Sequence, residues 1–510
     1  MCFKFWLYLF RLSFAPPKIM VFIGSDETYV NGITILAETL QHQGIQYVFG
    51  FCDITTTELR RALQCVGIQF IETRSERSAC YAAQAIGFLT QKPGVCLVRK
   101  KLGLLDVIGG IASATLNSWP LVVLGADERM ATGNFEEYHN VDSCRLHCKY
   151  SARPANAFLI PQHVEKAVRL ATYGNPGASY VELPATVLMQ NTRHEKVVTA
   201  SSAPRPPATL PDPVTISQAV NVLYPSKRPL LIVGPSAAYW RAEETILELV
   251  ENTYIPVVML PMAEGVVPDK HSQNVSSVRH KVLQTADVII LVGTKSNWRM
   301  HFGPTPRFNP RVKFIQIAAD AADLHYNDYG SQVEIVCDLA KGVKALTCAL
   351  LDEYFALHVA SVWWTQLYAM CKQNNAALKQ LSSISMAPLN SYAVFHHMQL
   401  LLPEDCMIVI DGATCMDVGR SLLQNRLPRH RLDAGTVEGA GPGFALAATV
   451  WAQHQGHQNV VCVTDALSTM ELETMFRYQL PLIVIVLSSS DSCKTQNENS
   501  TRKSSELTKM

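Results

Sequence analysis

The sequence predicts an α/β protein made of three doubly wound parallel-sheet domains. First, short apolar segments of strand length alternate with longer segments of helical periodicity, which is typical of βαβ units and parallel sheets. Second, this alternation forms three blocks, separated by a Pro-, Ala- and Ser-rich stretch at 197–214 and a helical region at about 348–381. Third, at about 150 residues a domain, a chain of 510 residues has room for three.

The predicted domain organisation follows the three blocks. The stretch at 197–214 lacks periodicity and is typical of an interdomain linker. The last residues are polar and aperiodic, which predicts a disordered tail. We therefore expect an irregular N-terminal extension over 1–24, a first domain over 25–190, a linker over 191–213, a central domain over 214–345, a helical connector over 346–387, a shortened third domain over 388–492 and a disordered tail over 493–510.

Within the first block, strands and helices alternate from residue 33 onward. Short runs rich in Val, Ile, Leu and Phe are separated by segments whose apolar residues recur every three or four positions, which is the spacing of one helix face. The expected strands are 45–51, 68–73, 94–98, 119–126 and 178–185, and the expected helices are 33–43, 55–66 and 75–91.

The other two blocks repeat this pattern. The central block opens with a buried strand, a glycine turn and an amphipathic helix over 228–250. The single glycine of its VGPSAA turn falls short of a full GxGxxG motif, which favours close strand-to-helix packing over a phosphate-binding loop. Further central strands are expected at 255–261, 287–293 and 312–317, and the third block has strand segments at 406–413, 459–466 and 480–491 with helices at 441–455 and 469–479.

The composition argues against several classes of function. With 44 Lys and Arg against 43 Asp and Glu, the net charge of +1 provides no broad basic field for nucleic acid. The apolar runs are strand-sized, well short of the ~18 residues that indicate a membrane span, so no membrane span is expected. The 14 cysteines are scattered without CxxC spacing, which is typical of reduced, buried thiols and not of a disulfide framework or zinc site.

Two carboxylates, Glu76 and Asp465, lie where they could take part in catalysis or metal binding. For each of them, the residue pattern leaves open whether its role is functional or only structural. Glu76 opens a helix of small and apolar residues; it is either a catalytic acid or a capping-box acid three residues after Thr73, and the local pattern favours the capping box. Asp465 ends an apolar strand, where open α/β sheets bind ligands; it is either an Mg²⁺ ligand or a helix N-cap. The sequence contains none of the usual hydrolase, Walker or kinase motifs.

Several stretches of the chain resemble one enzyme family. RSERSACYAAQAIGFLT, HCKYSARP, RLPRHRLDAGT and ETMFRYQLPLIVIV look like stretches of the thiamine-diphosphate-dependent 2-hydroxyacyl-CoA lyases, close kin of oxalyl-CoA decarboxylase. The resemblance covers about residues 28–495. It implies one domain that holds the cofactor's pyrimidine, a central domain, and one domain that holds the diphosphate with Mg²⁺, which agrees with the three blocks.

The resemblance also implies a reaction and the residues that carry it. Glu76 takes the place of the glutamate that protonates the aminopyrimidine, work that needs a carboxyl in apolar surroundings. The activated cofactor, acting as electron sink, would cleave a 2-hydroxyacyl-CoA to formyl-CoA and a shortened aldehyde. The implied thiamine-diphosphate contacts are Gly103, Glu136, Asp411, Gly412, Gly439 and Gly441, and the implied Mg²⁺ ligands are Asp465, Ser489 and Asp491.

The chain departs from the family almost entirely at the residues that would contact the cofactor, first in the loops of the first domain. The family's SGPG loop and following His become KKLG at 100–103 and Asp106, and its Gly-x-Pro turn becomes DIT at 53–55. The family's Gln-Glu pair is Glu136-Glu137 here. A backbone that approaches a cofactor closely tolerates larger or charged residues badly, so weaker binding is expected.

The third domain departs further from the family. The loop at 435–443 lacks the family's methionine, Thr464 replaces a glycine, and Ser489 stands in place of an asparagine. The Ser hydroxyl and the Asp491 carboxylate remain possible oxygen ligands for Mg²⁺, so the expected effect is weaker metal binding. The family's C-terminal segment, which closes this domain and ends in a peroxisomal address, is missing, and we expect a divergent, C-terminally shortened member.

Two classes of function therefore remain open: an active lyase with an unusual site, or a catalytically silent relative that binds an intact paralogue. Carboligation of the acetolactate-synthase type is a weaker third reading, because the shared stretches are those of the acyl-CoA branch. The expected partners are an acyl-CoA substrate and further subunits, in a homodimer, a homotetramer or a hetero-oligomer with a paralogue. The expected location is cytoplasmic or peroxisomal, although the chain has no SKL-type signal.

Overall fold

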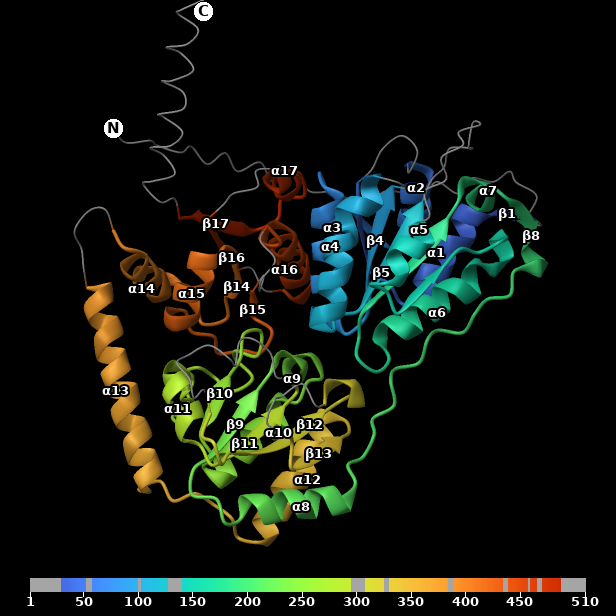
Figure 1. Ribbon diagram of the computed structural model, residues 1–510. Helices are drawn as coiled ribbons and strands as arrows, with labels where there is room; N and C mark the ends of the chain where they lie inside the picture. Colours follow the sequence, from blue (N-terminus) through green and yellow to red (C-terminus); the bar gives the residue numbers. More distant parts are fainter. Residues whose placement is uncertain are drawn as a thin grey trace, which may run out of the picture.

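The computed structural model contains three parallel β-sheets flanked by helices, which confirms the predicted fold class (Figure 1). In each sheet the strand order reverses beside the strand that comes first in the chain, which defines a doubly wound sheet. In Figure 1 the first and third units lie side by side, with the central unit below them. The structure describes residues 29–51, 57–99, 102–126, 140–294, 308–324, 330–383, 389–433, 439–456, 459–465 and 470–487.

The first unit contains a six-stranded parallel sheet in the order β3-β2-β4-β5-β7-β6. Its inner strands are almost wholly buried, as expected of a parallel sheet with helices on its faces. A short antiparallel pair of β1 and β8 joins the start and the end of the unit. The strands are β1 (Tyr29–Asn31), β2 (Tyr47–Gly50), β3 (Gln69–Glu72), β4 (Gly94–Arg99), β5 (Leu121–Ala126), β6 (Tyr150–Ala152), β7 (Ala178–Leu183) and β8 (Asn191–Arg193).

The helices of the first unit follow local signals in the sequence. The side chain of Asn31 caps α1 by accepting a hydrogen bond of 2.9 Å from the backbone N–H of Thr34. Most of the side chains of helix α3 are small or apolar, and nearly all of its residues are buried. The helices are α1 (Gly32–His42), α2 (Thr57–Cys65), α3 (Glu76–Thr90), α4 (Leu102–Asn117), α5 (Asn140–Arg145), η2 (Ala157–Leu159), α6 (Ile160–Thr172), α7 (Ala185–Leu188) and η3 (His194–Lys196).

The central unit contains a five-stranded parallel sheet in the order β10-β9-β11-β12-β13. Gly234, after β9, lies so close to Gly293 and Thr294 that a side chain would not fit, which agrees with the packing role expected for the VGPSAA turn. The elements are α8 (Pro213–Leu223), β9 (Pro229–Val233), α9 (Pro235–Tyr239), α10 (Glu243–Thr253), β10 (Val257–Met259), η4 (Ser276–Val278), α11 (Arg279–Thr285), β11 (Val288–Val292), β12 (Lys313–Ala318), η5 (Ala321–Asp323), β13 (Val333–Val336) and α12 (Leu339–Asp352).

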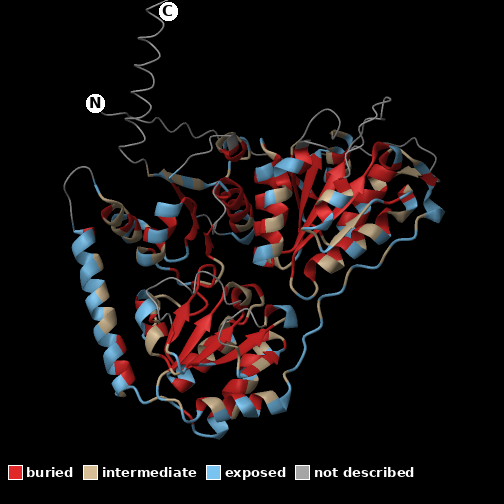
Figure 2. Ribbon diagram, in the orientation of Figure 1, coloured by how far each residue is buried: buried red, intermediate tan, exposed pale blue. Residues whose placement is uncertain are grey.

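The third unit contains a parallel sheet whose described strands follow the order β15-β14-β16-β17. Strand β17 lies at the edge and is more exposed than its neighbours (Figure 2). Helix α13 packs its first turns on the central unit, where Trp363, Trp364 and Leu367 join the hydrophobic core, and then leads into the third unit (Figure 1). The elements are α13 (Val362–Ser382), α14 (Ser391–Leu401), β14 (Met407–Ile410), α15 (Ala413–Leu422), β15 (Arg431–Asp433), α16 (Gly441–Gln455), β16 (Val460–Thr464), α17 (Met470–Arg477) and β17 (Leu482–Val486).

The segments between the units differ from the predicted boundaries in detail. Strand β8 and η3 fall inside the predicted linker, and β8 pairs with β1, so the chain is tied to the first unit as far as residue 193. Helix α12 extends into the range expected for the connector. The predicted extension over 1–24 and the tail over 493–510 lie outside the described residues. Within the described part of the chain, no helix is both long and apolar enough to cross a membrane.

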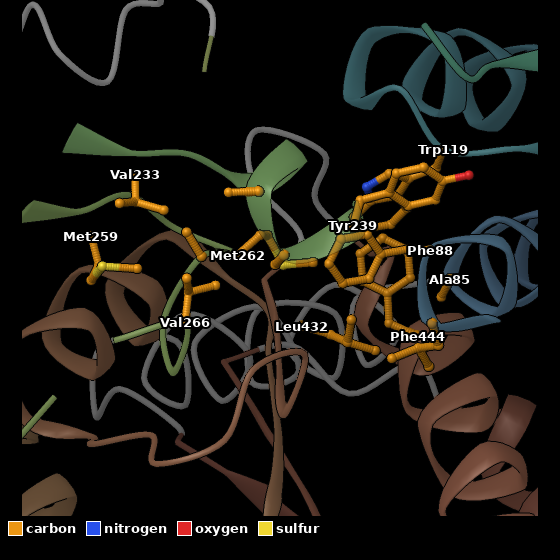
Figure 3. Packing of buried hydrophobic residues seen from close by; sticks show 14 of the residues in the cluster. Ala85, Phe88, Trp119, Val233, Tyr239, Met259, Met262, Val266, Leu432 and Phe444 are labelled. Atoms are coloured by element: carbon orange, nitrogen blue, oxygen red, sulfur yellow. The ribbon is translucent and has the colours of Figure 1, made fainter. Parts of the chain in front are cut away.

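One hydrophobic core joins the three units, and it contains Phe88, Trp119, Tyr239 and Phe444, labelled in Figure 3, together with Tyr81. Phe444 of α16 lies 5.9 Å from Tyr81 of α3 and 5.4 Å from Trp119, measured between ring centroids. Phe88 of α3 lies 4.9 Å from Trp119 and 6.4 Å from Tyr239 of the central unit. We call these five residues the aromatic junction. Tilted and edge-on contacts of this kind add about 0.5–1.5 kcal/mol each beyond the burial of area.

Helix α3 packs along α16, and small residues permit their close approach. A Cβ atom at Gly443 would lie 2.7 Å from the carbonyl oxygen of Ser78 and 2.7 Å from the Cβ atom of Tyr81. Residue 443 therefore has to be glycine for the helices to meet at this distance. Because both helices begin at the carboxyl edge of their sheets, their packing fixes the two edges relative to each other.

Truncation of the aromatic junction is expected to destabilise the whole chain. Phe444 is 1% exposed, and Phe444→Ala should lower the free energy of unfolding by about 3–5 kcal/mol because it leaves a cavity between the first and third units. Phe476→Ala is the matched control, since Phe476 is 86% exposed and its loss should cost less than about 0.5 kcal/mol. Urea unfolding followed by tryptophan fluorescence measures both; equal losses would contradict the role of the junction.

Candidate functional site

The candidate site lies at the carboxyl edges of the first and third sheets. In the third sheet the strand order reverses between β14 and β16, and Asp411 and Asp465 directly follow these two strands. In the first sheet, Arg99 ends β4, and Glu76 begins the helix after β3. Open α/β sheets bind ligands at such edges, so the two sequence-predicted carboxylates Glu76 and Asp465 both lie where a ligand is expected.

Glu76 is the first residue of α3, and its side chain is buried, with 3% of its surface exposed. Its carboxylate accepts hydrogen bonds from Arg99: 3.0 Å from the backbone N–H and 2.9 Å from Nε to Oε1, and 3.4 Å from a terminal guanidinium nitrogen to Oε2. The capping-box reading is therefore wrong. Helix α3 begins at Glu76 itself, so the carboxyl is one position after the N-cap Ser75, and Thr73 donates its hydroxyl to the carbonyl of Ser75.

Arg99 was not identified from the sequence, although it bonds both oxygens of the candidate acid. Its guanidinium carbon lies 4.4 Å above the centre of the Phe51 ring, a cation–π contact, and its side chain is 45% exposed. The available signal was the position: Arg99 is a charged residue at the end of the otherwise apolar run GVCLV. Which side chain Arg99 pairs with is visible only in the folded chain.

Gly103, predicted as a cofactor contact, lies directly against Glu76. A side chain at residue 103 would overlap the Glu76 carboxyl group. Glycine at this position thus keeps room for the acid at the start of α4. Glu136 lies outside the described residues, and so do Lys100, Lys101 and residues 53–55.

The predicted cofactor residues of the third unit form one cluster around Asp411, which is 2% exposed. Its carboxylate accepts hydrogen bonds of 3.0 Å from the N–H of Gly412 and 3.0 Å from the N–H of Gly441, the first residue of α16. A further backbone bond comes from Gly439, and burial raises the pKa of the Asp411 carboxyl. Asp411 thus places negative charge at the positive end of α16.

Asp465 lies on the other side of Gly412. Gly412 has φ +89°, and a side chain there would overlap the Asp465 carboxylate, so glycine is required on both counts. Asp465 is exposed, and the predicted partners Ser489 and Asp491 lie outside the described residues. Among the described residues, no group of three or more His, Cys, Asp or Glu side chains is arranged as a metal site.

A second residue that the sequence analysis did not identify, the acid Glu471, holds the start of α3 in place. Glu471 of α17 is fully buried, and its carboxylate accepts hydrogen bonds from the backbone N–H of Arg74 at 3.2 Å and the hydroxyl of Thr474 at 2.9 Å. Burial raises its pKa, and bonds from Ser75 and Ser78 oppose that rise. We call this contact the Glu471 clasp. It joins the third unit to the turn just before Glu76.

Ion pairs and a tyrosine extend the clasp on the surface side. Arg74 Nε lies 2.6 Å from Glu473, and Arg477 lies 2.8 Å from Glu72. The hydroxyl of Tyr478 accepts a hydrogen bond of 2.9 Å from the backbone N–H of Glu72. Exposed pairs contribute little individually, so the buried Glu471 carries most of this contact.

A cavity of about 700 Å³ opens between the central unit, α13 and α15. Basic side chains line it from both units, Arg279 and His280 from α11 and Arg420 from α15. Its wall includes Ala413, the residue after Gly412, so the cavity reaches the edge where Asp411 and Gly412 lie. Arg420 is held by two hydrogen bonds of 2.7 and 2.9 Å to the buried carboxylate of Asp433.

Comparisons with known proteins agree with this arrangement. Residues 30–143 match the profile of the thiamine pyrophosphate enzyme N-terminal TPP binding domain, and 216–346 match that of the central domain. The chain is 42% identical to human 2-hydroxyacyl-CoA lyase 1 over 92% of its own length and 83% of that protein. It is 32% identical to Escherichia coli oxalyl-CoA decarboxylase, over 89% and 82%.

A solved structure supports the fold. The chain superimposes on a putative thiamin diphosphate-dependent enzyme from Mycobacterium smegmatis with a TM-score of 0.75 and 17% identity, over 90% of this chain and 88% of that one. The domain profiles and the identity to the curated relatives thus define a thiamine-diphosphate-dependent enzyme. Within that class, the chain belongs to the 2-hydroxyacyl-CoA lyase family, a family of carbon–carbon lyases in which Mg²⁺ is the usual partner of the cofactor.

The residues of the two edges fit this cofactor unequally. At the third sheet, a carboxylate and glycine backbone at the strand ends suit a metal-bound diphosphate. At the first sheet, Glu76 has the position and burial expected of the pyrimidine acid, but both its oxygens accept hydrogen bonds from Arg99. In this conformation the guanidinium of Arg99 already donates to both of the oxygens that would face a pyrimidine ring.

Asp269 gives the cavity region a pH dependence with a defined sign. It joins the central and third units by accepting a hydrogen bond of 2.7 Å from the N–H of Asn425, and burial raises its pKa to about 6. Because the folded state keeps this proton to a higher pH than the unfolded chain, the associated stability is present below pH ~4 and lost as pH rises through 6. The loss should be roughly 1–3 kcal/mol.

Asp269→Asn should remove this part of the pH dependence, since the amide does not titrate. The measurement is the free energy of unfolding in urea between pH 4 and pH 7. Asp417→Asn is the control, because Asp417 lines the same cavity but its side chain is 83% exposed. If Asp269→Asn retained the slope of the unaltered chain, Asp269 would not be its source.

Proposed function

We propose that this chain catalyses the thiamine-diphosphate-dependent cleavage of a 2-hydroxyacyl-CoA to formyl-CoA and a shortened aldehyde. The observation that carries the proposal is Glu76: a carboxyl with 3% of its side chain exposed, at the first residue of a helix and at the ligand-binding edge of its sheet. The curated relatives named 2-hydroxyacyl-CoA lyase, from human and mouse among others, support the choice of reaction. The bound cofactor supplies the electron sink for carbon–carbon cleavage.

The chain's own residues have separate tasks in this proposal. Glu76 would hold and donate a proton at the pyrimidine, from a buried position beside the guanidinium of Arg99. Asp465 supplies a carboxylate oxygen to Mg²⁺, and Gly412 keeps the backbone beside it free of side chains. Asp411 orders the start of α16 by accepting the N–H of Gly441, so that the helix end faces the same edge.

The cavity between the central and third units is the proposed place of the acyl-CoA. Its volume of about 700 Å³ falls in the range of ligand sites. Arg279 and Arg420 give it guanidinium groups of the kind that bind phosphate, beside the acidic side chains of Glu264, Asp269 and Asp417. The wall at Ala413 connects it with the edge of the third sheet, which would bring the acyl end of the substrate towards the cofactor.

A second candidate function is a catalytically silent subunit that pairs with an intact paralogue. The observation that favours it is the Arg99–Glu76 contact, because the guanidinium already donates to both of the oxygens that would have to bind the pyrimidine. This proposal includes an oligomer, a homodimer or homotetramer in the first case and a hetero-oligomer in the second. In such an assembly each site combines the glutamate edge of one subunit with the metal edge of the other.

The direct test supplies the purified full chain with thiamine diphosphate, Mg²⁺ and a 2-hydroxyacyl-CoA. Formyl-CoA is expected as product, and Glu76→Gln should abolish it, typically by a factor of at least 10², because the amide keeps the shape but cannot transfer the proton. Glu165→Gln is the control, since Glu165 also pairs with an arginine in the first unit but lies away from the sheet edge. The absence of formyl-CoA at all cofactor concentrations would reject the active-enzyme proposal.

The silent-subunit proposal has its own test in a mixed assembly. The chain is co-expressed with an intact homologue whose pyrimidine glutamate has been replaced, so that neither subunit alone has a complete site. Activity that appears only in the mixture, and that Glu76→Gln in this chain removes, is the expected sign of a shared site. Failure of the two chains to co-purify would contradict the proposal of a hetero-oligomer.

A further inference from the structure

The contact between Arg99 and Glu76 combines a buried carboxylate with a half-exposed guanidinium. The Glu76 side chain is 3% exposed and the Arg99 side chain 45% exposed. The guanidinium bonds Oε1 through Nε at 2.9 Å and Oε2 through a terminal nitrogen at 3.4 Å, which is the forked geometry of a strong charge-assisted pair. One partner is therefore fixed inside the protein, while the other has solvent on one side.

The backbone contribution to Glu76 is independent of the Arg99 side chain. The N–H of Arg99 donates to Oε1 at 3.0 Å, and this donor is fixed because Arg99 ends β4, paired with Ala126 of β5. If the guanidinium moved out towards solvent, Oε1 would keep this bond while Oε2 would lose the one from the terminal guanidinium nitrogen. A buried carboxylate that has lost a donor is stabilised by any new donor that reaches it.

The contact with Phe51 sets how the guanidinium is held. The guanidinium carbon lies 4.4 Å above the centre of the ring, which adds a cation–π attraction. Phe51 follows β2, and Arg99 ends β4; these are the two strands between which the order of the first sheet reverses. The guanidinium thus lies across the crevice where a doubly wound sheet binds its ligand.

We infer that the Arg99 side chain is an internal lock on the site, which competes with the pyrimidine of the cofactor for the carboxylate of Glu76. The inference rests on the proposed function only in placing the pyrimidine at Glu76. Binding then becomes an exchange: the guanidinium leaves Oε2 for solvent, the carboxylate takes up a proton from solvent, and Oε2 shares this proton with a ring nitrogen of the pyrimidine. The affinity for the cofactor is reduced by whatever the Arg99 side chain contributes to the closed state.

The test compares Arg99→Met with a matched variant, Arg169→Met. Arg169 lies in the same unit, its side chain is 43% exposed, and it bonds Glu165 through Nε at 2.8 Å and a terminal nitrogen at 3.3 Å, so it loses the same kind of pair. Titration calorimetry with thiamine diphosphate and Mg²⁺ measures binding without any turnover. We expect Arg99→Met to bind about tenfold more tightly than the unaltered chain, and Arg169→Met to bind equally.

A double-mutant cycle isolates the competition from other effects. In a Glu76→Gln background, removing Arg99 should change the affinity much less than in the unaltered chain, because the competition is for the carboxylate. Thermal unfolding without ligand shows whether each variant is folded. If Arg99→Met does not fold, Arg99→Lys is measured instead, since it keeps the charge but not the fork and should give a smaller gain in affinity.

The outcomes separate the lock from the proposed reaction. Tighter binding by Arg99→Met without formyl-CoA production supports the lock and rejects the lyase activity. Equal or weaker binding by the folded Arg99→Met variant overturns the lock, whether or not the unaltered chain is an active lyase. Absence of binding by both the unaltered chain and Arg99→Met also overturns it.

Discussion

The packing of α3 on α16 is the contact on which the rest of the structure depends. Each helix begins at the ligand edge of its sheet, α3 with Glu76 and α16 with Gly441. The aromatic junction around Phe444 holds them together and reaches the central unit through Tyr239 (Figure 3). Because interiors are packed as densely as crystals, a shift of one helix would move the other. The relative position of these two edges within one chain is therefore set by apolar packing.

The Glu471 clasp adds polar contacts of defined geometry between α17 and the start of α3 to this apolar packing. A buried carboxylate is costly unless its oxygens are bonded, and Glu471 meets this need with the backbone N–H of Arg74 and the hydroxyl of Thr474. Placed at the start of α3, its charge also suits the positive end of that helix. The turn before Glu76 is thus held by the third unit as well as by its own sheet. The position of Glu76 therefore depends on contacts from both units.

Within this rigid frame, the chain satisfies its own charges. Arg99 bonds the carboxylate of Glu76, and Asp411 accepts the N–H groups at the start of α16. Sites that bind a charged group usually leave a helix end or a carboxylate available to it. Here a ligand has to replace contacts that already exist, at least at Glu76. The site of this chain therefore differs from one that is open before binding. The choice between an active lyase and a catalytically silent subunit then depends on the side chain of Arg99.

The sequence by itself determined the fold class, most of the helices and strands, and the location of Glu76 at a helix start and of Asp465 at a strand end, because periodicity records which face of a local segment is buried. It did not determine the partners of those side chains. Glu76 was assigned to a capping box because local spacing was the only evidence, whereas its bonds come from Arg99, 23 residues further along. Glu471 meets Arg74 across 397 residues. Only tertiary packing brings such groups together, since hydrogen bonds between distant segments leave no period in the sequence.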